Sequence, residues 1–452
     1  MNLNSIFTNQ RTGNHRQDIV FRTDFQRDFD RIIFSSAFRR LQNKTQVFPL
    51  PGSVFVHNRL THSLEVASVG RSLGSLAGEF IFKNYESELD ENSKNFYLHQ
   101  LNNVIASACL CHDIGNPAFG HSGEDAIASY FEKNKSFLKS HFSEKEWTDL
   151  LNFEGNANAI RILTNQQKGK DKGGLQLTFT TLASIAKYPC ESIAKKKTVI
   201  KRKKFGFFQN EKETFLEIAK GTAMSAESEN PVIFKRHPFV WLVEAADDIC
   251  YNIIDMEDAH RLGVVNSGDC ENLFVDLIKS VNPDDIKRVE EKLAIITNKN
   301  ERISYLRAKV INSLINKTIA IYEENFGKIL DGSLDKGILD IFKTESSSLS
   351  EIERFSVEKI YNHKAVVEIE NAGYNVMYEL LNHFIPSIIK EKSNRKLYDE
   401  KALKLIPNQF IYDEETVYQK VLGVLDFVSG MTDNFATDLY RKIKGIEIGM
   451  TV

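Results

Sequence analysis

The chain has 452 residues, of which 42% are hydrophobic and 26% are charged, and this ordinary globular composition argues against wholesale disorder. Its formal net charge of -3 removes any argument that the whole protein binds nucleic acid electrostatically, although a local basic patch is still allowed. At this length we expect one large body with appended lobes or two coupled domains, large enough to bury a deep site.

The five cysteines are odd in number, have no C-x-x-C spacing and fall mostly in apolar helical patterns. This usage is typical of buried free thiols in a reducing compartment. The N-terminus has no apolar signal region, and no later window approaches the roughly 20 apolar residues that a membrane span needs. We therefore expect a cytoplasmic protein without a membrane partner.

Apolar residues recur at helical spacing over residues 24–42. The following stretch, KTQVFPLPGSVFVHNR, favours a short strand or hairpin because β-branched residues are interrupted by prolines and a glycine. The same three- and four-residue spacing then predicts helices over residues 62–83, 99–113, 124–140 and 152–166.

The pattern changes between residues 167 and 235. QQKGKDKGG predicts a surface loop, and the basic stretch KKKTVIKRKKFGFF predicts a hairpin or mobile arm. Helical periodicity returns at FVWLVEAADDICYNIIDMEDAHRL and continues to about residue 393, and a final helix is expected near 414–443. The sequence therefore predicts a mainly α protein with a small insertion.

Residues with metal-binding side chains stand at three places along this pattern. His112 and Asp113 are adjacent where an apolar helix ends, so that both can bind one divalent cation if other helices deliver further ligands. His62 stands upstream at the start of a helix, and Asp247 and Asp248 lie inside an otherwise apolar helix. A buried acid there requires a metal, a salt bridge or a raised pKa, and a salt bridge is the simpler alternative.

The H…HD…D pattern resembles the HD-domain superfamily and, within it, the bacterial deoxyguanosinetriphosphate triphosphohydrolases, also called dGTPases or dNTP triphosphohydrolases. Blocks similar to those of the family follow in the family's order and cover most of the chain: RRLQNKTQVFP, HNRLTHSLEVA, HDIGNPAFGHSGE, FEGNANAIR, KYP, KFGFF, EAADDICYNIIDMED and FVSGMTD. The resemblance implies metal ligands at His62, His112, Asp113 and Asp247, with Asp248 left as an alternative to Asp247.

The resemblance also implies an HD-domain helical core with additional helical segments and a small β-hairpin or loop insertion. Four regions are expected: the N-terminal part of the core with the metal and catalytic motifs, the insertion with candidate phosphate contacts, a helix that completes the metal site, and a C-terminal helical region. Their boundaries are 1–166, 167–235, 236–265 and 266–452.

The expected cofactor is one divalent metal ion per active site, with Mn²⁺ or Mg²⁺ first and Co²⁺, Fe²⁺, Ni²⁺ or Zn²⁺ as alternatives. Imidazole ligands favour the transition metals over magnesium in affinity, but cellular availability can reverse that order. Two imidazoles and two carboxylates would leave coordination positions for water and a phosphate oxygen.

His121 and Glu124 are three residues apart at a predicted helix start, so both can face one site. By resemblance, His121 protonates the departing 5′ oxygen, Glu124 fixes its tautomer and raises its pKa, and Glu154 assists. The structural alternative is a helix-capping histidine beside a surface glutamate.

Asp247, Tyr251 and Asp255 recur every four residues and so lie along one stripe of a helix. In related enzymes the tyrosine packs on the deoxyribose and the second aspartate accepts from its 3′ hydroxyl, which would exclude a 2′ hydroxyl by crowding. A tyrosine in the core is the alternative.

A triphosphate also needs cationic partners, preferably including the planar fork of an arginine. The candidate phosphate contacts are Arg59, Lys187, Tyr188 and Lys204. The candidate nucleoside contacts are Gln46, Arg39 and Asn156. The remaining lysines of the basic run are interpreted as a solvated face.

These features together predict metal-dependent hydrolysis of a dNTP, dGTP first, by water attack at the α-phosphorus, giving a deoxynucleoside and inorganic triphosphate. One alternative is an HD-type nucleotide phosphodiesterase or 5′-nucleotidase, and another is a non-catalytic nucleotide sensor or DNA-binding oligomer. The resemblance further implies a homo-oligomer, commonly a hexamer, with activation by a nucleotide at a second site or by single-stranded DNA.

Overall fold

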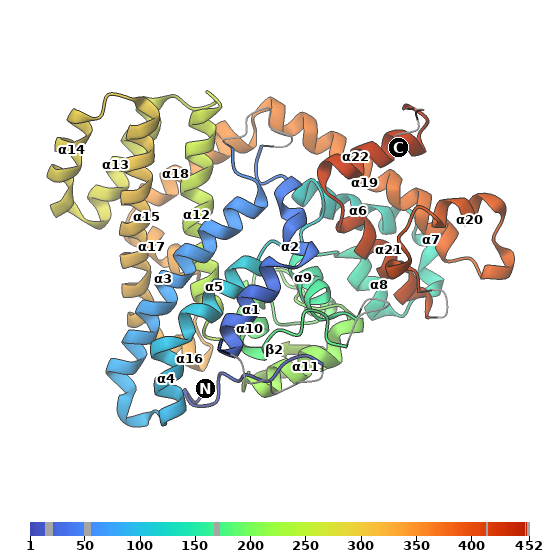
Figure 1. The fold of residues 1–452 in the computed structure, drawn as a ribbon, viewed down its shortest axis with the longest axis horizontal. Helices are drawn as coiled ribbons and strands as arrows, with labels where there is room; N and C mark the ends of the chain where they lie inside the picture. The colour runs from blue at the N-terminus through green and yellow to red at the C-terminus, as the bar shows by residue number, and fades with distance from the viewer. Residues whose placement is uncertain (14–20, 49–55, 167–171, 413–414, 448, 450–452) are drawn as a thin grey trace.

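The computed structural model describes residues 1–13, 21–48, 56–166, 172–412, 415–447 and 449. Within them the chain forms 22 α-helices, short 3-10 turns and one antiparallel pair of strands, β1 (Ala226–Glu229) and β2 (Val232–Phe234). The prediction of a mainly α fold is confirmed (Figure 1).

The helices of the first half, α1 to α12, are Asp24–Ile33, Ser36–Arg40, Arg59–Tyr85, Glu91–His99, Leu101–Cys111, Gly120–Lys133, Lys135–Leu138, Glu144–Leu151, Gly155–Thr164, Phe179–Ile185, Lys212–Gly221 and Val240–Arg261. Those of the second half, α13 to α22, are Ser267–Val281, Ile286–Ile295, Lys299–Glu324, Phe326–Asp331, Ile338–Glu345, Ser348–Ser356, Lys364–Ile388, Leu397–Leu403, Val417–Ser429 and Asp433–Ile443.

Two of the predicted helices are divided by capping residues. The helix expected over 24–42 breaks before Ser35, whose side chain accepts from the backbone N–H of Phe38 and starts α2. The helix expected near 414–443 breaks in the same way, because Thr432 accepts from the N–H of Phe435 and starts α22. Short polar caps inside an apolar repeat therefore turn one predicted helix into two.

The insertion contains a hairpin, but the hairpin is not formed by the basic stretch for which it was predicted. The basic stretch contains one 3-10 turn, Ile200–Arg202, and a second, Ser192–Ala194, comes just before it; the strands follow later as β1 and β2. A mobile arm is also the wrong description, because Phe205, Phe207 and Phe208 at the end of this stretch are fully buried. Three buried aromatic rings hold the stretch against the core.

Two predicted segments fall partly outside the described residues. Of the strand or hairpin expected before the first long helix, residues 49–55 are outside, and Thr45 and Asn58 on either side form an antiparallel bridge. Of the predicted surface loop QQKGKDKGG, residues 167–171 are outside. The boundaries of the four predicted regions stay predictions.

Helices α3 and α5 pack closely because glycines on α3 face α4 and α5. A Cβ atom at Gly78 would lie 2.0 Å from the carbonyl oxygen of Tyr97, and one at Gly70 would lie 2.4 Å from Sγ of Cys109. The α12 helix packs on α3 and α15 (Figure 1). This close packing brings the helix carrying His62 alongside the helix that ends at His112.

The buried apolar side chains form two clusters. The first includes residues of α1, α3, α5, α10, α12, α13 and α15, and the second includes residues of α6, α8, α19 and α21. The segment between α5 and α6 passes from one cluster to the other, because Ile114 belongs to the first and Ala118 and Phe119 belong to the second. The motif HDIGNPAFGH therefore lies at the junction of the two clusters.

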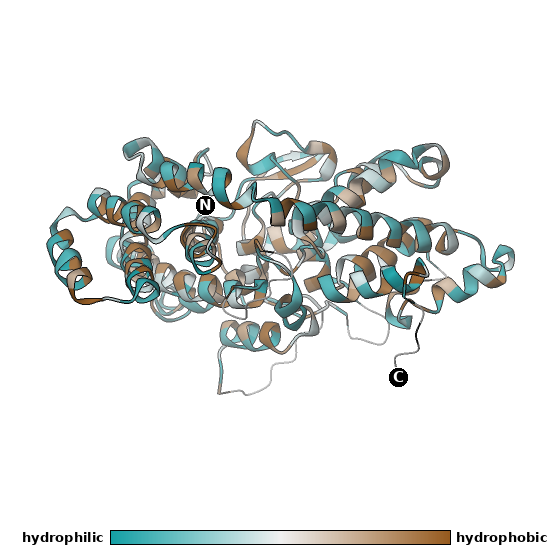
Figure 2. Cartoon of the chain, turned by 90° about the horizontal axis from the view of Figure 1, so that it is seen from above, coloured by the Kyte–Doolittle hydropathy of each residue, from teal (hydrophilic) through white to brown (hydrophobic). Residues whose placement is uncertain are grey.

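Figure 2 shows hydrophilic and hydrophobic residues alternating along the same helices, the arrangement expected of amphipathic helices that share a core. Across the described part of the chain, every helix is too short or too polar to cross a membrane.

Candidate active site

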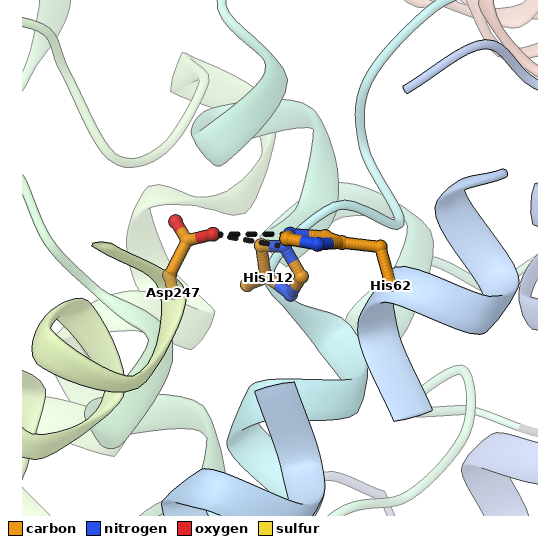
Figure 3. Close-up of side chains that lie close together, drawn as sticks. All are labelled: His62, His112 and Asp247. Atoms are coloured by element: carbon orange, nitrogen blue, oxygen red, sulfur yellow. Dashed lines mark hydrogen bonds and ion pairs between the residues drawn. The ribbon is translucent and has the colours of Figure 1, made fainter. Parts of the chain in front are cut away.

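Three of the predicted metal ligands meet at the contact of α3, α5 and α12 (Figure 3). His62 lies on α3, His112 ends α5 and Asp247 lies on α12, and their ligand atoms are within 4.8 Å of one another. Oδ1 of Asp247 is 3.3 Å from Nε2 of His62 and 3.4 Å from Nε2 of His112. The close packing of three helices thus gathers ligands that are far apart in the sequence.

The hydrogen bonding of His112 fits a metal ligand. Its Nδ1 atom lies 2.6 Å from the carbonyl oxygen of Cys109, which only accepts, so Nδ1 carries the proton and Nε2 has the lone pair. Nε2 is buried and, among the described residues, has no hydrogen-bond partner while it faces the carboxylate of Asp247. In the neutral imidazole the two acceptors face each other, and either a proton on Nε2 or a divalent metal ion between them stabilises this arrangement.

The surrounding charges favour a cation at the same place. Burial lowers the pKa of His112, but the carboxylates of Asp113 and Asp247 outweigh burial and raise the pKa to about 9. Burial raises the pKa of Asp247, but the ammonium of Lys187 and the two histidines hold that pKa well below its usual range. Asp247 is therefore an ionised carboxylate directed at two imidazoles.

Asp113 lies at the edge of this group and is paired with Arg59. Nη1 of Arg59 donates to Oδ2 of Asp113 at 2.6 Å, and the amide of Asn116 donates to Oδ1 at 2.5 Å. Oδ2 of Asp113 is also 3.5 Å from Nε2 of His112. Asp113 is thus near enough to contribute to a metal site, and Arg59 neutralises it from the other side.

The geometry distinguishes the two neighbouring acids on α12. Asp247 faces the histidines, whereas Asp248 lies outside the ligand group. Burial and, next, the carboxylate of Glu244 raise the pKa of Asp248 to about 8. Asp247 belongs to the group of ligand atoms within 4.8 Å of one another and Asp248 does not, so Asp247 fits the metal site better than Asp248 does.

His121 and Glu124 form the pair that their spacing predicts. Nδ1 of His121 lies 2.8 Å from Oε2 of Glu124, and Oε1 of Glu124 accepts from the N–H of Gly155 at 2.7 Å. The hydrogen bond with Glu124 raises the pKa of His121, whose side chain is 82% exposed. A buried carboxylate therefore holds an exposed imidazole in one tautomer, with Nε2 directed away from Glu124.

Glu154 and Lys204 complete this side of the site. Nζ of Lys204 donates to Oε1 of Glu154 at 2.9 Å and lies 3.9 Å from Oε2 of Glu124. Burial and the nearby charge of Glu124 raise the pKa of Glu154. Lys204 therefore neutralises two close carboxylates, and the structure pairs it with acids rather than leaving it unpaired for phosphate.

A cavity of about 290 Å³ lies beside His121 and Arg59. Its lining consists of Thr45, Gln46, Val47, Arg59, Phe119, Gly120, His121, Tyr251, Tyr361, Val366 and Glu370. Segments from both ends of the chain therefore build its walls.

The α12 stripe contributes to this cavity as its spacing predicts, and a second tyrosine joins it. Tyr251 and Tyr361 stack with ring centroids 5.6 Å apart, and the hydroxyl of Tyr361 donates to Oδ2 of the buried Asp255 at 2.9 Å. The sequence analysis did not single out Tyr361. It stands in a π-helical turn, residues 357–361, and local periodicity gave no sign that it would meet α12.

Several candidate contacts are engaged with protein groups. Lys187 donates to Oδ2 of Asp247 at 3.0 Å, the side-chain amide of Asn156 donates to Oε1 of Glu154 at 2.7 Å, and the guanidinium of Arg236 lies 5.7 Å from the ring centroid of Tyr188. Lys187 thus lies at the metal site, and Asn156 lies beside the His121 group.

Gln46 and Arg39 occupy different environments. Gln46 lines the cavity, and its buried Oε1 has no hydrogen-bond partner among the described residues. Arg39 is exposed on α2, and the described residues that line the cavity do not include it. The structure therefore favours Gln46 over Arg39 as a ligand contact.

Two family models match parts of the chain. The model of the HD domain matches residues 59–171, which contain His62, His112, Asp113 and His121, and the model of the phosphohydrolase-associated domain matches residues 343–442. The second match includes Tyr361 and α19, the helix that packs on α6.

Relatives match almost the whole chain. A deoxyguanosinetriphosphate triphosphohydrolase-like protein of Synechocystis sp. is 38% identical over 437 residues, which cover 94% of this chain and 95% of that protein. One of the same name from Pseudomonas aeruginosa is 34% identical over 452 residues, covering 98% and 99% of the two chains. A deoxyguanosinetriphosphate triphosphohydrolase of Yersinia pestis is 28% identical over 496 residues, covering 94% of each. With HD-domain residues gathered at one site and relatives matched from end to end, the chain belongs to the family of deoxyguanosinetriphosphate triphosphohydrolase-like proteins, which carry an HD domain.

Proposed function

We propose that this protein hydrolyses a deoxynucleoside triphosphate at its α-phosphorus in a metal-dependent reaction, releasing a deoxynucleoside and inorganic triphosphate. The observation that carries the proposal is that Arg59 links two groups: it pairs with Asp113 beside His62, His112 and Asp247, and it lines the same cavity as the exposed His121 that a buried Glu124 orients. The names of the relatives support the class of reaction.

The metal would be held by His62, His112 and Asp247, with Asp113 as the fourth ligand. A bound divalent ion of this kind polarises a phosphate oxygen and lowers the pKa of a water molecule that it binds. Mn²⁺ and Mg²⁺ are our first candidates, and Co²⁺, Fe²⁺, Ni²⁺ and Zn²⁺ are compatible with imidazole and carboxylate ligands.

His121 would act as the general acid. Water adds to the α-phosphorus while the bond from phosphorus to the 5′ oxygen breaks, and His121 Nε2–H supplies the proton that this oxygen needs to leave as a hydroxyl. The hydrogen bond from Nδ1 to Glu124 keeps the other nitrogen directed outward and stabilises the protonated imidazole. Lys204, which pairs with Glu154, would attract Glu124 and so help to hold it in place.

The cavity would bind the nucleoside. Tyr251 would pack on the sugar, and the Tyr361 hydroxyl, held by Asp255, would narrow the space beside the 2′ carbon, favouring deoxyribose over ribose. Gln46 would use its unpartnered Oε1 atom for the nucleoside. Arg59 and Lys187 would contact the phosphates once phosphate oxygens replace their carboxylate partners, Asp113 and Asp247.

Guanine is our first choice of base. Guanine presents two neighbouring donors, N1–H and the N2 amino group, and Glu370 in the cavity lining offers a carboxylate that can accept from both. The names of the relatives specify deoxyguanosine triphosphate for those proteins. An oligomer, a nucleotide effector and single-stranded DNA are further proposals that rest on the family resemblance.

The experiment that tests the proposal is product analysis by anion-exchange chromatography, after incubation with each of the four dNTPs, and with GTP, in Mn²⁺ or Mg²⁺. Deoxynucleoside and intact triphosphate would support cleavage at the α-phosphorus, and the relative rates would rank the bases. Phosphate or pyrophosphate would instead indicate a phosphohydrolase of a different kind. Absence of turnover in every mixture would favour the nucleotide sensor.

A further inference from the structure

The segment that leads into His121 has an unusual backbone conformation. Phe119 has a φ of 60°, and Gly120 after it has a φ of 58°, so two successive residues adopt the left-handed conformation immediately before the proposed general acid. A phenylalanine adopts this conformation only when its surroundings enforce it. The contacts that enforce it therefore decide where His121 lies.

Those contacts come from the C-terminal part of the chain. Oδ1 of Asp433, the first residue of α22, accepts from the backbone N–H of Phe119 at 3.0 Å, 314 positions away in the sequence. The ring of Phe119 lies against Gly373 on α19, where an added Cβ atom would be 2.3 Å from Cγ of Phe119. An acid and a glycine of two late helices thus fix one residue of the HD motif.

The same carboxylate also fixes the opposite wall of the cavity. Oδ2 of Asp433 accepts from the N–H of Thr45 at 2.9 Å and from the Thr45 hydroxyl. Asp433 is 1% exposed, and both Thr45 and Phe119 line the cavity. One buried carboxylate therefore sets the separation between the Thr45–Gln46 wall and the Phe119–His121 wall.

A second buried charge holds the other end of the same segment. Nζ of Lys44, a 3% exposed side chain, donates to the carbonyl oxygens of Asn116 at 2.5 Å and of Ser429 at 2.9 Å. The segment between α5 and α6 is thus attached to the C-terminal helices at both Asn116 and Phe119.

We propose that Asp433 is a positioning residue for catalysis: its carboxylate, by accepting from Phe119 and Thr45, holds His121 where it can protonate the leaving oxygen. The proposal rests on the proposed role of His121 as general acid. It assigns to the phosphohydrolase-associated region a part in the chemistry, beyond packing against the HD domain.

The test compares Asp433→Asn with His121→Ala on two substrates. The asparagine side chain has a single acceptor oxygen, so either Phe119 or Thr45 loses its acceptor and faces an amide N–H instead. One substrate is dGTP, and the other is its analogue with sulfur in place of the bridging 5′ oxygen, whose thiolate leaves without a proton. Asp438→Asn is the matched control, because it makes the same change of charge at an exposed position of the same helix.

With dGTP, we expect Asp433→Asn to lower kcat about 10- to 100-fold, as misplacement of a catalytic group by about 1 Å does. With the sulfur analogue, we expect both Asp433→Asn and His121→Ala to stay close to the unmodified enzyme. The double variant should be no slower on dGTP than His121→Ala, because both changes remove the same proton transfer. Asp438→Asn should behave as the unmodified enzyme.

One result would overturn the positioning role and leave the proposed function intact: Asp433→Asn lowers kcat equally on both substrates, whereas His121→Ala lowers it on dGTP and not on the sulfur analogue. If His121→Ala lowers kcat equally on both substrates, His121 is not the general acid. If Asp433→Asn does not fold, hydrogen exchange of the Phe119 amide in the unmodified protein decides: slow exchange supports the carboxylate contact, and exchange at the rate of a free peptide overturns it.

Discussion

Nε2 of His112 and Oδ1 of Asp247 face each other at 3.4 Å, and the Nδ1 proton of the same histidine is already used by the carbonyl oxygen of Cys109. In the neutral imidazole the Nε2 lone pair is thus directed at a carboxylate oxygen, and a cation between the two, a proton or a bound metal ion, stabilises this arrangement. This relationship, rather than the presence of any one residue type, makes the group a candidate metal site.

Substitution of either residue should therefore remove the metal. We expect His112→Ala and Asp247→Ala to lower the bound metal, measured by elemental analysis of the purified protein, and to reduce kcat by about 100-fold or more. Asp248→Asn is the control, because Asp248 lies outside the ligand group and has a pKa raised to about 8 by burial and by Glu244. Loss of metal in Asp248→Asn with retention in Asp247→Ala would reverse the assignment.

The pH dependence of kcat should report the contact between His121 and Glu124. Since this hydrogen bond raises the pKa of His121 above its ordinary value of 6.5, a general acid here stays protonated, and the enzyme active, to a higher pH. Activity should fall as the pH rises through the raised pKa. Glu124→Gln removes the charge, so the alkaline limb should move to lower pH, while an unchanged limb would assign it to another group.

Discrimination between deoxyribose and ribose should depend on the tyrosine pair. Tyr251→Ala removes one ring of the stack with Tyr361 and widens the cavity, so the ratio of kcat/KM for dGTP to that for GTP should fall about 10-fold. Tyr398→Ala, at an exposed tyrosine of α20, should leave the ratio unchanged. A constant ratio in Tyr251→Ala would exclude crowding by this ring as the basis of sugar selection.

Stability should depend on the buried ion pairs that join α9 to α21. Arg161 donates to both carboxylate oxygens of Asp426, at 2.7 Å each, and to Glu211 at 2.6 Å, with its side chain 3% exposed. Arg161→Met leaves two buried acids without their cation, so the free energy of unfolding should fall by about 3–5 kcal/mol in a denaturant titration. Arg354→Met, at an exposed position of α18, is the control and should change the free energy of unfolding by less than about 0.5 kcal/mol.

Much of the fold follows from local pattern. The three- and four-residue repeat of apolar side chains predicts most of the long helices, and the break after Cys111 predicts where the HD motif leaves its helix. The spacing of His121 and Glu124 also predicts their contact, because residues three apart on a helix are neighbours. The hairpin was misplaced because the basic stretch is held by three buried phenylalanines, and nothing in a charge run indicates what its flanking rings will pack against.

The sequence by itself determined the helical class, the candidate metal ligands and the pairs that share one helical turn, since these depend on residue type and on spacing within a single element. Tertiary structure decided which acid of α12 faces the histidines, that Arg59 pairs with Asp113, that Tyr361 meets Asp255 of α12, and that Asp433 contacts Phe119. Neighbouring residues on a helix differ by about 100° in direction, so Asp247 and Asp248 cannot both face the histidines. The way in which α3, α5 and α12 pack determines that Asp247 does. Contacts such as that of His62 with Asp247, 185 positions apart, depend on how helices pack, and packing is fixed by the burial of many side chains at once rather than by any local motif.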